Sequence, residues 1–270
     1  MLFVFFRART QYDGNAYGYR QGFFGTIVGV DRLYGHSTRV GLYASYGEGR
    51  ISSDLLEKSD SKELLVGLYL RREMQIGYML LNGGLGYNQY DTERTITFMD
   101  YTAKNRHSGF VGTVYGERGV EFQGALAKWQ PFMGLQYIGN QQESFTETGA
   151  DCLNLVGDTI TGSSLRSLLG TRLSADLARS HRRSLALYGQ AVWMHEFLDS
   201  TYTNFTARFQ GVANSTKFTV RGNDMARDWA VLGTGLTYDR ANWRLFAGYD
   251  IAMNDRQVLH SGNASLAYGW

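Results

Sequence analysis

The chain has 270 residues, with 33 glycines, one proline and a formal net charge of +2. Glycine without proline excludes a collagen-like chain, the small charge argues against a nucleic-acid partner, and no run of about 18 apolar residues is available for a membrane-spanning helix. The 18 tyrosines and 15 phenylalanines favour strands, and the length suits one large all-β domain.

The chain begins with an apolar stretch that does not read as a secretory signal. Residues 1–6 are apolar, but they are too few for a signal core, and Arg7 follows at once. If the protein lies in an outer membrane, we expect its export signal to lie upstream of this chain.

The dominant period along the chain is two. Val40, Leu42, Ala44 and Tyr46 alternate with small or polar residues, and residues 63–71 and 243–251 follow the same rule. A wall with one apolar face and one polar face is typical of a membrane barrel. We expect the following apolar residues to face outward: Leu64, Val66, Leu68, Leu245, Tyr249 and Leu266.

This pattern predicts about twelve strands, an even number, as expected for a single-chain bacterial barrel. They are 3–10, 17–34, 37–53, 60–74, 76–98, 104–123, 127–147, 165–178, 184–198, 227–240, 242–254 and 258–270. Tight turns near residue 35 and at 239–242 contrast with long loops at 149–164 and 200–224. Alternation fails at 78–81, so we expect a β-bulge or a shifted strand boundary there.

The last strand organises the fold. Ala264, Leu266, Tyr268 and Trp270 share one face, which would be a liability on an exposed sheet edge in water. We therefore predict that this strand pairs with the first and closes one antiparallel transmembrane barrel over 1–270, with Leu266, Tyr268 and Trp270 on the closing strand and Trp270 at a membrane interface. A chance edge strand in a soluble all-β domain is the alternative.

Charged residues on the opposite face should point into the pore, because a charge facing hydrocarbon is costly. We expect these pore-lining residues to be Glu63, Arg71, Glu117, Arg172, Arg244 and Asp250. They can pair across the lumen and stiffen the wall, line the route of a threaded segment, or do both. Inward glycines should leave room for that segment, namely Gly41, Gly67, Gly170, Gly233, Gly235 and Gly248.

No residues are assigned to catalysis, to a metal or to a cofactor. His195 and Glu196 are adjacent on a strand, so they point to opposite faces and cannot act together as an acid–base pair. No nucleophile elbow frames a serine. Cys152 is the single cysteine, so it has no partner for an internal disulfide, and no basic residue immediately flanks it.

Several segments, in order along the chain, resemble the autotransporter β-domain family of type V secretion. They are 29–32, 129–131, 135–137, 143–150, 153–155, 163–172, the Trp-Met-His-Glu-Phe strand at 193–197, 218–222 and 227–236. The resemblance implies a twelve-stranded translocator in the bacterial outer membrane that carries a covalently linked upstream passenger to the cell surface. It also implies contact with outer-membrane lipid and lipopolysaccharide, and with the barrel-assembly machinery.

The chain differs from the family pattern at both ends. The family places a pore-threading helix before the first strand, whereas here the first strand starts almost at Met1, and the family usually ends in Phe, whereas here Trp270 is last. Two other functions stay open: a barrel of similar size acting as a channel or adhesin, and an outer-membrane hydrolase with its site on the long-loop rim.

Overall fold

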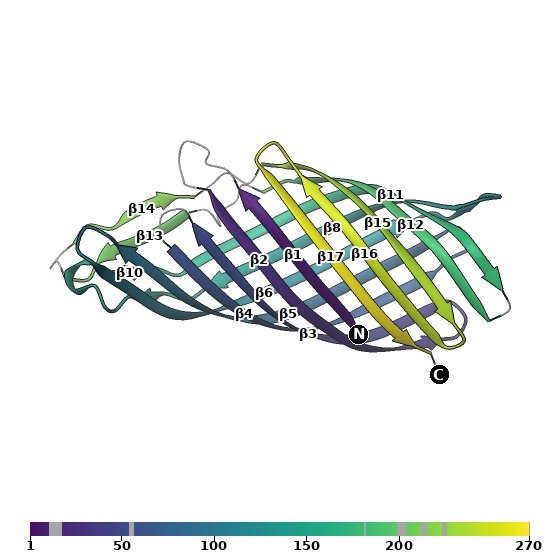
Figure 1. Ribbon diagram of the computed structural model, residues 1–270, viewed down its shortest axis with the longest axis horizontal. Coiled ribbons are helices and arrows are strands. Elements are labelled where there is room, and N and C mark those ends of the chain that lie inside the picture. The colour runs from purple at the N-terminus through teal and green to yellow at the C-terminus, as the bar shows by residue number, and fades with distance from the viewer. Residues whose placement is uncertain are drawn as a thin grey trace.

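The protein is a closed antiparallel β-barrel whose strands are steeply tilted (Figure 1). The computed structural model describes residues 1–10, 18–53, 57–180, 182–198, 204–211, 215–222 and 226–269. Twelve strands of this described part form the wall. They are β1 (Leu2–Thr10), β2 (Tyr19–Tyr34), β3 (Thr38–Ser53), β4 (Glu57–Glu73), β5 (Tyr78–Ile96), β6 (Tyr101–Gly119), β8 (Lys128–Gln142), β11 (Ile160–Ser180), β12 (Arg183–Glu196), β15 (Asp228–Arg240), β16 (Trp243–Met253) and β17 (Gln257–Tyr268).

The wall follows chain order and closes between its ends. Each wall strand pairs with the next, and β17 pairs with β1 from Leu2↔Ser265 to Thr10↔Gln257. The Met1 ammonium also donates to the Leu266 carbonyl at 2.8 Å. This closure confirms the predicted pairing of the last strand with the first, and it leaves neither strand with an open edge.

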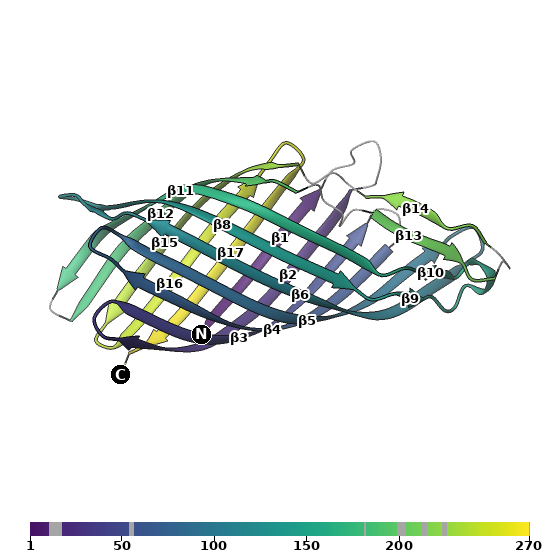
Figure 2. The same cartoon turned by 180° about the vertical axis from the view of Figure 1, so that it is seen from behind.

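The two rims of the barrel differ. One rim carries both chain ends and short turns such as 35–37 and 241–242, and we call it the short-turn rim. The other, the long-loop rim, carries 143–159 and the described residues 197–198, 204–211, 215–222 and 226–227 (Figure 2). No helix in the described residues is long and apolar enough to cross a bilayer.

The long loops contain more structure than the sequence predicts. A four-stranded rim sheet is built from β9 (Phe145–Thr146), β10 (Leu155–Gly157), β13 (Asn204–Phe209) and β14 (Phe218–Arg221), with the short 3-10 helix η1 (Asp151–Leu153) between β9 and β10. These strands are too short to show a period, and the central pairing of β10 with β13 joins distant residues, as in Leu155↔Phe209.

Two local expectations differ from the structure in part. Residues 78–81 pair without interruption on both sides, so no bulge lies there; the strand boundary is shifted instead, since β5 begins at Tyr78. The register shifts between Asp176 and Ala178 in β11. The predicted strand 104–123 divides into β6 and a separate β7 (Phe122–Gln123), which continues the pairing along β8.

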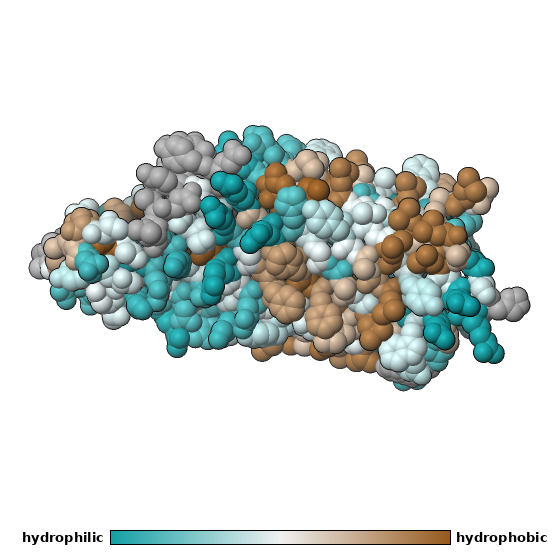
Figure 3. Space-filling model, in the orientation of Figure 1, coloured by the Kyte–Doolittle hydropathy of each residue, from teal (hydrophilic) through white to brown (hydrophobic). Residues whose placement is uncertain are grey.

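On the face shown in Figure 3, hydrophobic surface gathers over one part of the outer wall, which we call the apolar belt. On β4 the side chains of Leu64, Val66 and Leu68 are 55%, 56% and 58% exposed, while their neighbours Leu65 and Tyr69 are turned away. Leu245, Tyr249 and Leu266 are 46%, 44% and 40% exposed. All six residues therefore lie on the outer face, as the alternation predicts, and lipid is the solvent that fits them.

Candidate functional site: the inner wall

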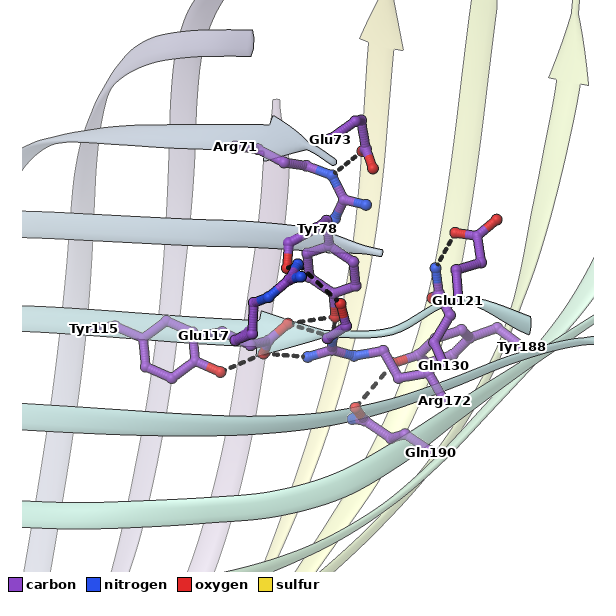
Figure 4. Close-up of polar contacts among 12 residues, drawn as sticks. Arg71, Glu73, Tyr78, Tyr115, Glu117, Glu121, Gln130, Arg172, Tyr188 and Gln190 are labelled. Atoms are coloured by element: carbon purple, nitrogen blue, oxygen red, sulfur yellow. Dashed lines mark hydrogen bonds and ion pairs between the residues drawn. The ribbon is translucent and has the colours of Figure 1, made fainter. Parts of the chain in front are cut away.

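Polar side chains from distant strands meet on the inner wall (Figure 4). At the centre lies Glu117 of β6, whose side chain is 1% exposed, and Arg172 of β11, whose side chain is 24% exposed. Arg172 donates from its two terminal nitrogens to the two Glu117 oxygens, at 2.6 and 2.8 Å. Because β8 separates β6 from β11, only side chains on the concave face of the wall can meet in this way.

Two tyrosines complete the shell of Glu117. Tyr78 donates its hydroxyl to one carboxylate oxygen at 2.6 Å, and Tyr115 donates to the other. Every partner of the carboxylate is thus a donor, which favours its ionised form. Tyr78 also accepts a 2.6 Å bond from Arg172, so the three strands β5, β6 and β11 are tied together.

Two arginine guanidinium groups beside Glu117 stack on aromatic rings. The Arg172 guanidinium carbon lies 3.8 Å from the Phe132 ring centroid, and that of Arg71 lies 4.2 Å from the Tyr78 ring centroid. Stacking on an aromatic face suits the planar guanidinium. We call Arg71, Tyr78, Tyr115, Glu117, Phe132 and Arg172 the lumen cluster.

A second set of bonds continues round the wall. Gln190 donates to Asp250 at 2.6 Å and accepts from the Tyr188 hydroxyl at 2.8 Å, while Asn263 donates to the other Asp250 oxygen at 3.3 Å. These residues lie on β12, β16 and β17. Polar bonding on the inner wall therefore runs from β4 to β17, and the Asp250 carboxylate is held by two neutral amides.

The structure brings together only part of the predicted pore-lining set. Arg71, Glu117 and Arg172 meet in the lumen cluster, and Asp250 belongs to the adjoining bonds. Arg244 lies near the short-turn rim, 65% exposed, where it pairs with Asp239 at 2.7 Å. Glu63 lies on the inner face of β4 away from the cluster, and none of the described residues forms an ion pair with it.

The inward glycines do not leave empty space. A methyl group on Gly41 would lie 2.5 Å from the Tyr69 ring, one on Gly170 2.7 Å from the Phe132 ring, and one on Gly67 2.4 Å from the Tyr43 ring. Gly235 and Gly248 are covered by Phe246, while Gly233 faces Asp250. The expectation of vacant room at each glycine is therefore wrong. The glycines instead let large rings lie close along the wall.

Tyr78, Tyr115, Phe132 and Gln190 were not among the residues that the sequence singled out. The alternation of side chains could have identified them. Each points to the same face as a charged residue that is predicted to face inward on its own strand or on the adjoining strand, as Tyr115 does with Glu117. For Tyr78 the signal was hidden, because Leu80 also faces inward and breaks the apolar alternation.

The rim sheet is attached to the inner wall by an ion pair and a ring stack. Arg94 of β5 donates to Glu147 at 2.6 and 3.2 Å and to the Leu153 carbonyl at 3.0 Å. Rings of Tyr90, His107, Phe145 and Phe205 stack in series, with centroids 5.0, 5.1 and 5.8 Å apart. The long loops are therefore anchored to the barrel.

The residues weighed for catalysis lie apart. His195 contacts Asp228 at 2.8 Å on the outer side of the rim, while Glu196 turns inward to Ser164, Arg166 and the Leu165 amide. In the described part of the chain, no group of three His, Cys, Asp or Glu residues could hold a metal ion. Cys152 is exposed and lies within η1.

The short-turn rim has its own ion pair. Glu121, between β6 and β7, pairs with Lys128 at 2.6 Å. That hydrogen bond lowers the pKa of the Glu121 carboxyl below its ordinary value. Elsewhere on this rim, the rings of Tyr268 and Trp243 lie 4.7 Å apart, at the end of the closing strand. Trp270 falls outside the described residues, so the structure does not place it.

Comparisons with known proteins agree with this architecture. The family described as "Autotransporter beta-domain" matches residues 4–250. An extracellular serine protease of Serratia marcescens is 25% identical over 264 residues, which cover 95% of this chain and 24% of that protein. The chain thus spans about a quarter of the length of the curated relatives it matches.

Solved structures show the same fold. The translocator domain of the autotransporter NalP from Neisseria meningitidis has a TM-score of 0.79 at 19% identity, covering 100% of this chain and 88% of that one. The β-domain of the Bordetella autotransporter Brka has a TM-score of 0.70 at 20% identity, covering 100% and 98%. At these identities the likeness speaks for the fold alone.

Proposed function

This chain belongs to the autotransporter β-domain family and is an outer-membrane barrel, and from that premise we propose that it translocates a covalently linked upstream passenger to the cell surface through its lumen. The relatives support a longer protein, since this chain corresponds to only 24% of the Serratia protease. The passenger's identity and activity are separate questions.

The main support for this proposal is the position of the first residues of β1 in the barrel. Met1 is bonded to Leu266 at the short-turn rim, and β1 runs from there towards the long-loop rim. Short turns face the periplasm in barrels of this kind, and long loops face the exterior. A passenger joined ahead of Met1 would start on the periplasmic side.

The lumen is the physically favourable route outward for such a segment. On the lipid side, its backbone groups would find no hydrogen-bond partners. The inner wall offers polar side chains: Asp250, Tyr188 and Gln190 are half-buried, and the Arg172 side chain is 24% exposed. We propose that Glu63, Arg71, Glu117, Arg172 and Asp250 line this route, with Arg244 near its short-turn mouth.

The closing strand gives this function a second requirement. Because β17 and β1 complete the wall, the route exists only after they pair. We propose that the barrel-assembly machinery acts on β17, whose outward Leu266 and Tyr268 are 40% and 48% exposed. Insertion of the wall would thus precede, or accompany, export of the passenger.

The test joins a reporter domain to this chain. A signal peptide, a soluble reporter and a helical linker are fused ahead of Met1, and whole cells are treated with protease. We expect the reporter to be cleaved from intact cells, whereas the same secreted reporter without the barrel stays protected in the periplasm. If the barrel migrates as a heat-sensitive folded band while the reporter stays protected, the proposed function is wrong.

A further inference from the structure

A group of outward-facing cations lies next to the apolar belt on β1 and β2, on its long-loop side. Arg7 and Arg9 of β1 and Arg20 of β2 are all exposed. Arg9 is directly opposite Arg20 in the β1–β2 register, and Arg7 is directly opposite His260 of β17. We call Arg7, Arg9, Arg20 and His260 the basic patch.

The three arginines of the basic patch lack the ion-pair partners that several neighbouring cations have, whereas His260 bonds to the Tyr249 hydroxyl at 2.6 Å. Like charges directly opposite in a sheet destabilise it, and none of the described residues forms an ion pair with Arg7, Arg9 or Arg20. Three outward cations at a similar height on β3 and β6 are instead neutralised in pairs, namely Arg50–Asp60, Lys104–Glu93 and Arg106–Asp91. An external anion would relieve the repulsion.

A groove of about 490 Å³ adjoins the patch. Its floor includes Phe5 and Phe24, which are 52% and 55% exposed, and Gly22, opposite Arg7, where an added methyl group would meet nothing within 4 Å.

The groove's acids are already engaged. Asp60 and Asp91 are each bonded to an arginine, and Glu48 accepts a 2.8 Å bond from the Tyr46 hydroxyl. On its far side, Lys62 adds a further cation. Apolar floor and cationic edge therefore meet at one level, the border between hydrophobic and hydrophilic surface on this face (Figure 3).

We propose that this patch and groove bind a phosphorylated glycolipid of the outer leaflet. Its phosphates would bond to Arg7, Arg9 and Arg20, because guanidinium matches phosphate with paired N–H donors. Its acyl chains would lie on Phe5, Phe24 and the belt below. The proposal uses the orientation stated above, with the long-loop rim at the exterior, but it does not depend on passenger export.

The test measures lipid binding to the purified, folded barrel in detergent. The probe is lipid A with two phosphates, and bound lipid is counted by native mass spectrometry across a titration. We expect R9E/R20E to weaken binding by at least about tenfold. The control R32E/R72E reverses two exposed arginines on the short-turn side of the belt, and we expect its affinity to stay within about twofold of the parent chain.

Two further binding measurements identify which part of the lipid is recognised. Lipid A without phosphates should bind as weakly to the parent chain as the intact lipid binds to R9E/R20E, and inorganic phosphate should not displace the intact lipid. If R9E/R20E does not fold, R9Q/R20Q replaces it. Equal binding by the charge variants, equal binding of dephosphorylated lipid, or displacement by inorganic phosphate would each overturn the proposal. If the barrel binds the lipid but does not export the reporter, the lipid site is supported and only the proposed translocation function is wrong.

Discussion

The outer and inner faces of the same wall are satisfied in different ways. On the outer face Leu64, Val66 and Leu68 are each more than half exposed and need only lipid around them. On the inner face Glu117 is 1% exposed and depends on Tyr78, Tyr115 and Arg172 from other positions in the wall. Residues on the outer face therefore contribute to stability independently of one another. Residues on the inner face contribute through contacts that depend on one another.

A charge placed in the middle of the outer face should have the largest effect. Val66→Arg puts a guanidinium into the belt, and we expect the free energy of unfolding in lipid vesicles to fall by about 2–4 kcal/mol. The measurement is urea unfolding followed by tryptophan fluorescence.

The matched control places the same side chain on the other face. Ser45 faces inward on β3, next to Ala44, the residue opposite Val66. We expect Ser45→Arg to cost less than about 1 kcal/mol, because the lumen can hydrate the charge. Equal losses for the two variants would mean that the faces are not distinct.

Breaking the central pair of the inner face should come next. Glu117→Ala leaves Arg172 without its carboxylate. Removing one member of a fully buried pair costs about 3–5 kcal/mol, and because Arg172 is 24% exposed we expect about 2–3 kcal/mol here.

Coupling is tested with the double variant. E117L/R172L removes both charges, so we expect it to be more stable than Glu117→Ala alone. Unfolding midpoints of the single variants E117L and R172L and of the double variant form the cycle. If the double variant loses as much free energy of unfolding as the two single variants together, the inner residues act independently, as the outer ones do.

A methyl group on an inward glycine should have a smaller effect. Gly170→Ala would press on Phe132, which is 4% exposed and lies under Arg172, so the ring has little room to move. We expect a loss of about 1–2 kcal/mol from overpacking. Gly189→Ala is the control, since its nearest atom would be 3.9 Å away, and thermal unfolding should show it unchanged.

The ion pair between Glu121 and Lys128 at the short-turn rim should matter least. The pKa of Glu121 is lowered by Lys128, so the pair stabilises the fold above the carboxyl's ordinary value of 4.5 and loses this contribution as pH falls through the lower folded value. Glu121→Gln should cost less than about 1 kcal/mol at pH 7. The difference from the parent chain should shrink in unfolding measured at pH 3; a difference that grows would contradict the assignment.

The same contrast explains what the sequence could predict. All twelve wall strands follow from a period of two, because the choice between lipid and lumen is made residue by residue, as along Leu64 to Leu68. The contact of Arg172 with Tyr78 joins residues 94 apart, and it depends on the closed wall and its stagger. Alternation indicated that Arg172 faces inward but could not name its partners.

The rim sheet was beyond prediction for another reason. Leu155–Gly157 is too short to show a period, and its pairing with Phe209, Arg208 and Ala207 joins two separate long loops. Such strands exist because Arg94–Glu147 and the ring stack hold the loops over the wall. None of these contacts produces a recognisable pattern in the local amino-acid sequence.

The most direct measurement asks which face of the wall the passenger touches during export. In a Cys152→Ser background, a cysteine is placed at Thr113, which faces inward on β6, or at Val114, its outward neighbour with 59% exposure. A reporter fusion stalled during export carries a second cysteine in its linker. The account predicts a disulfide to position 113 and none to position 114; cross-linking at 114 alone, or equally at both, would contradict passage through the lumen.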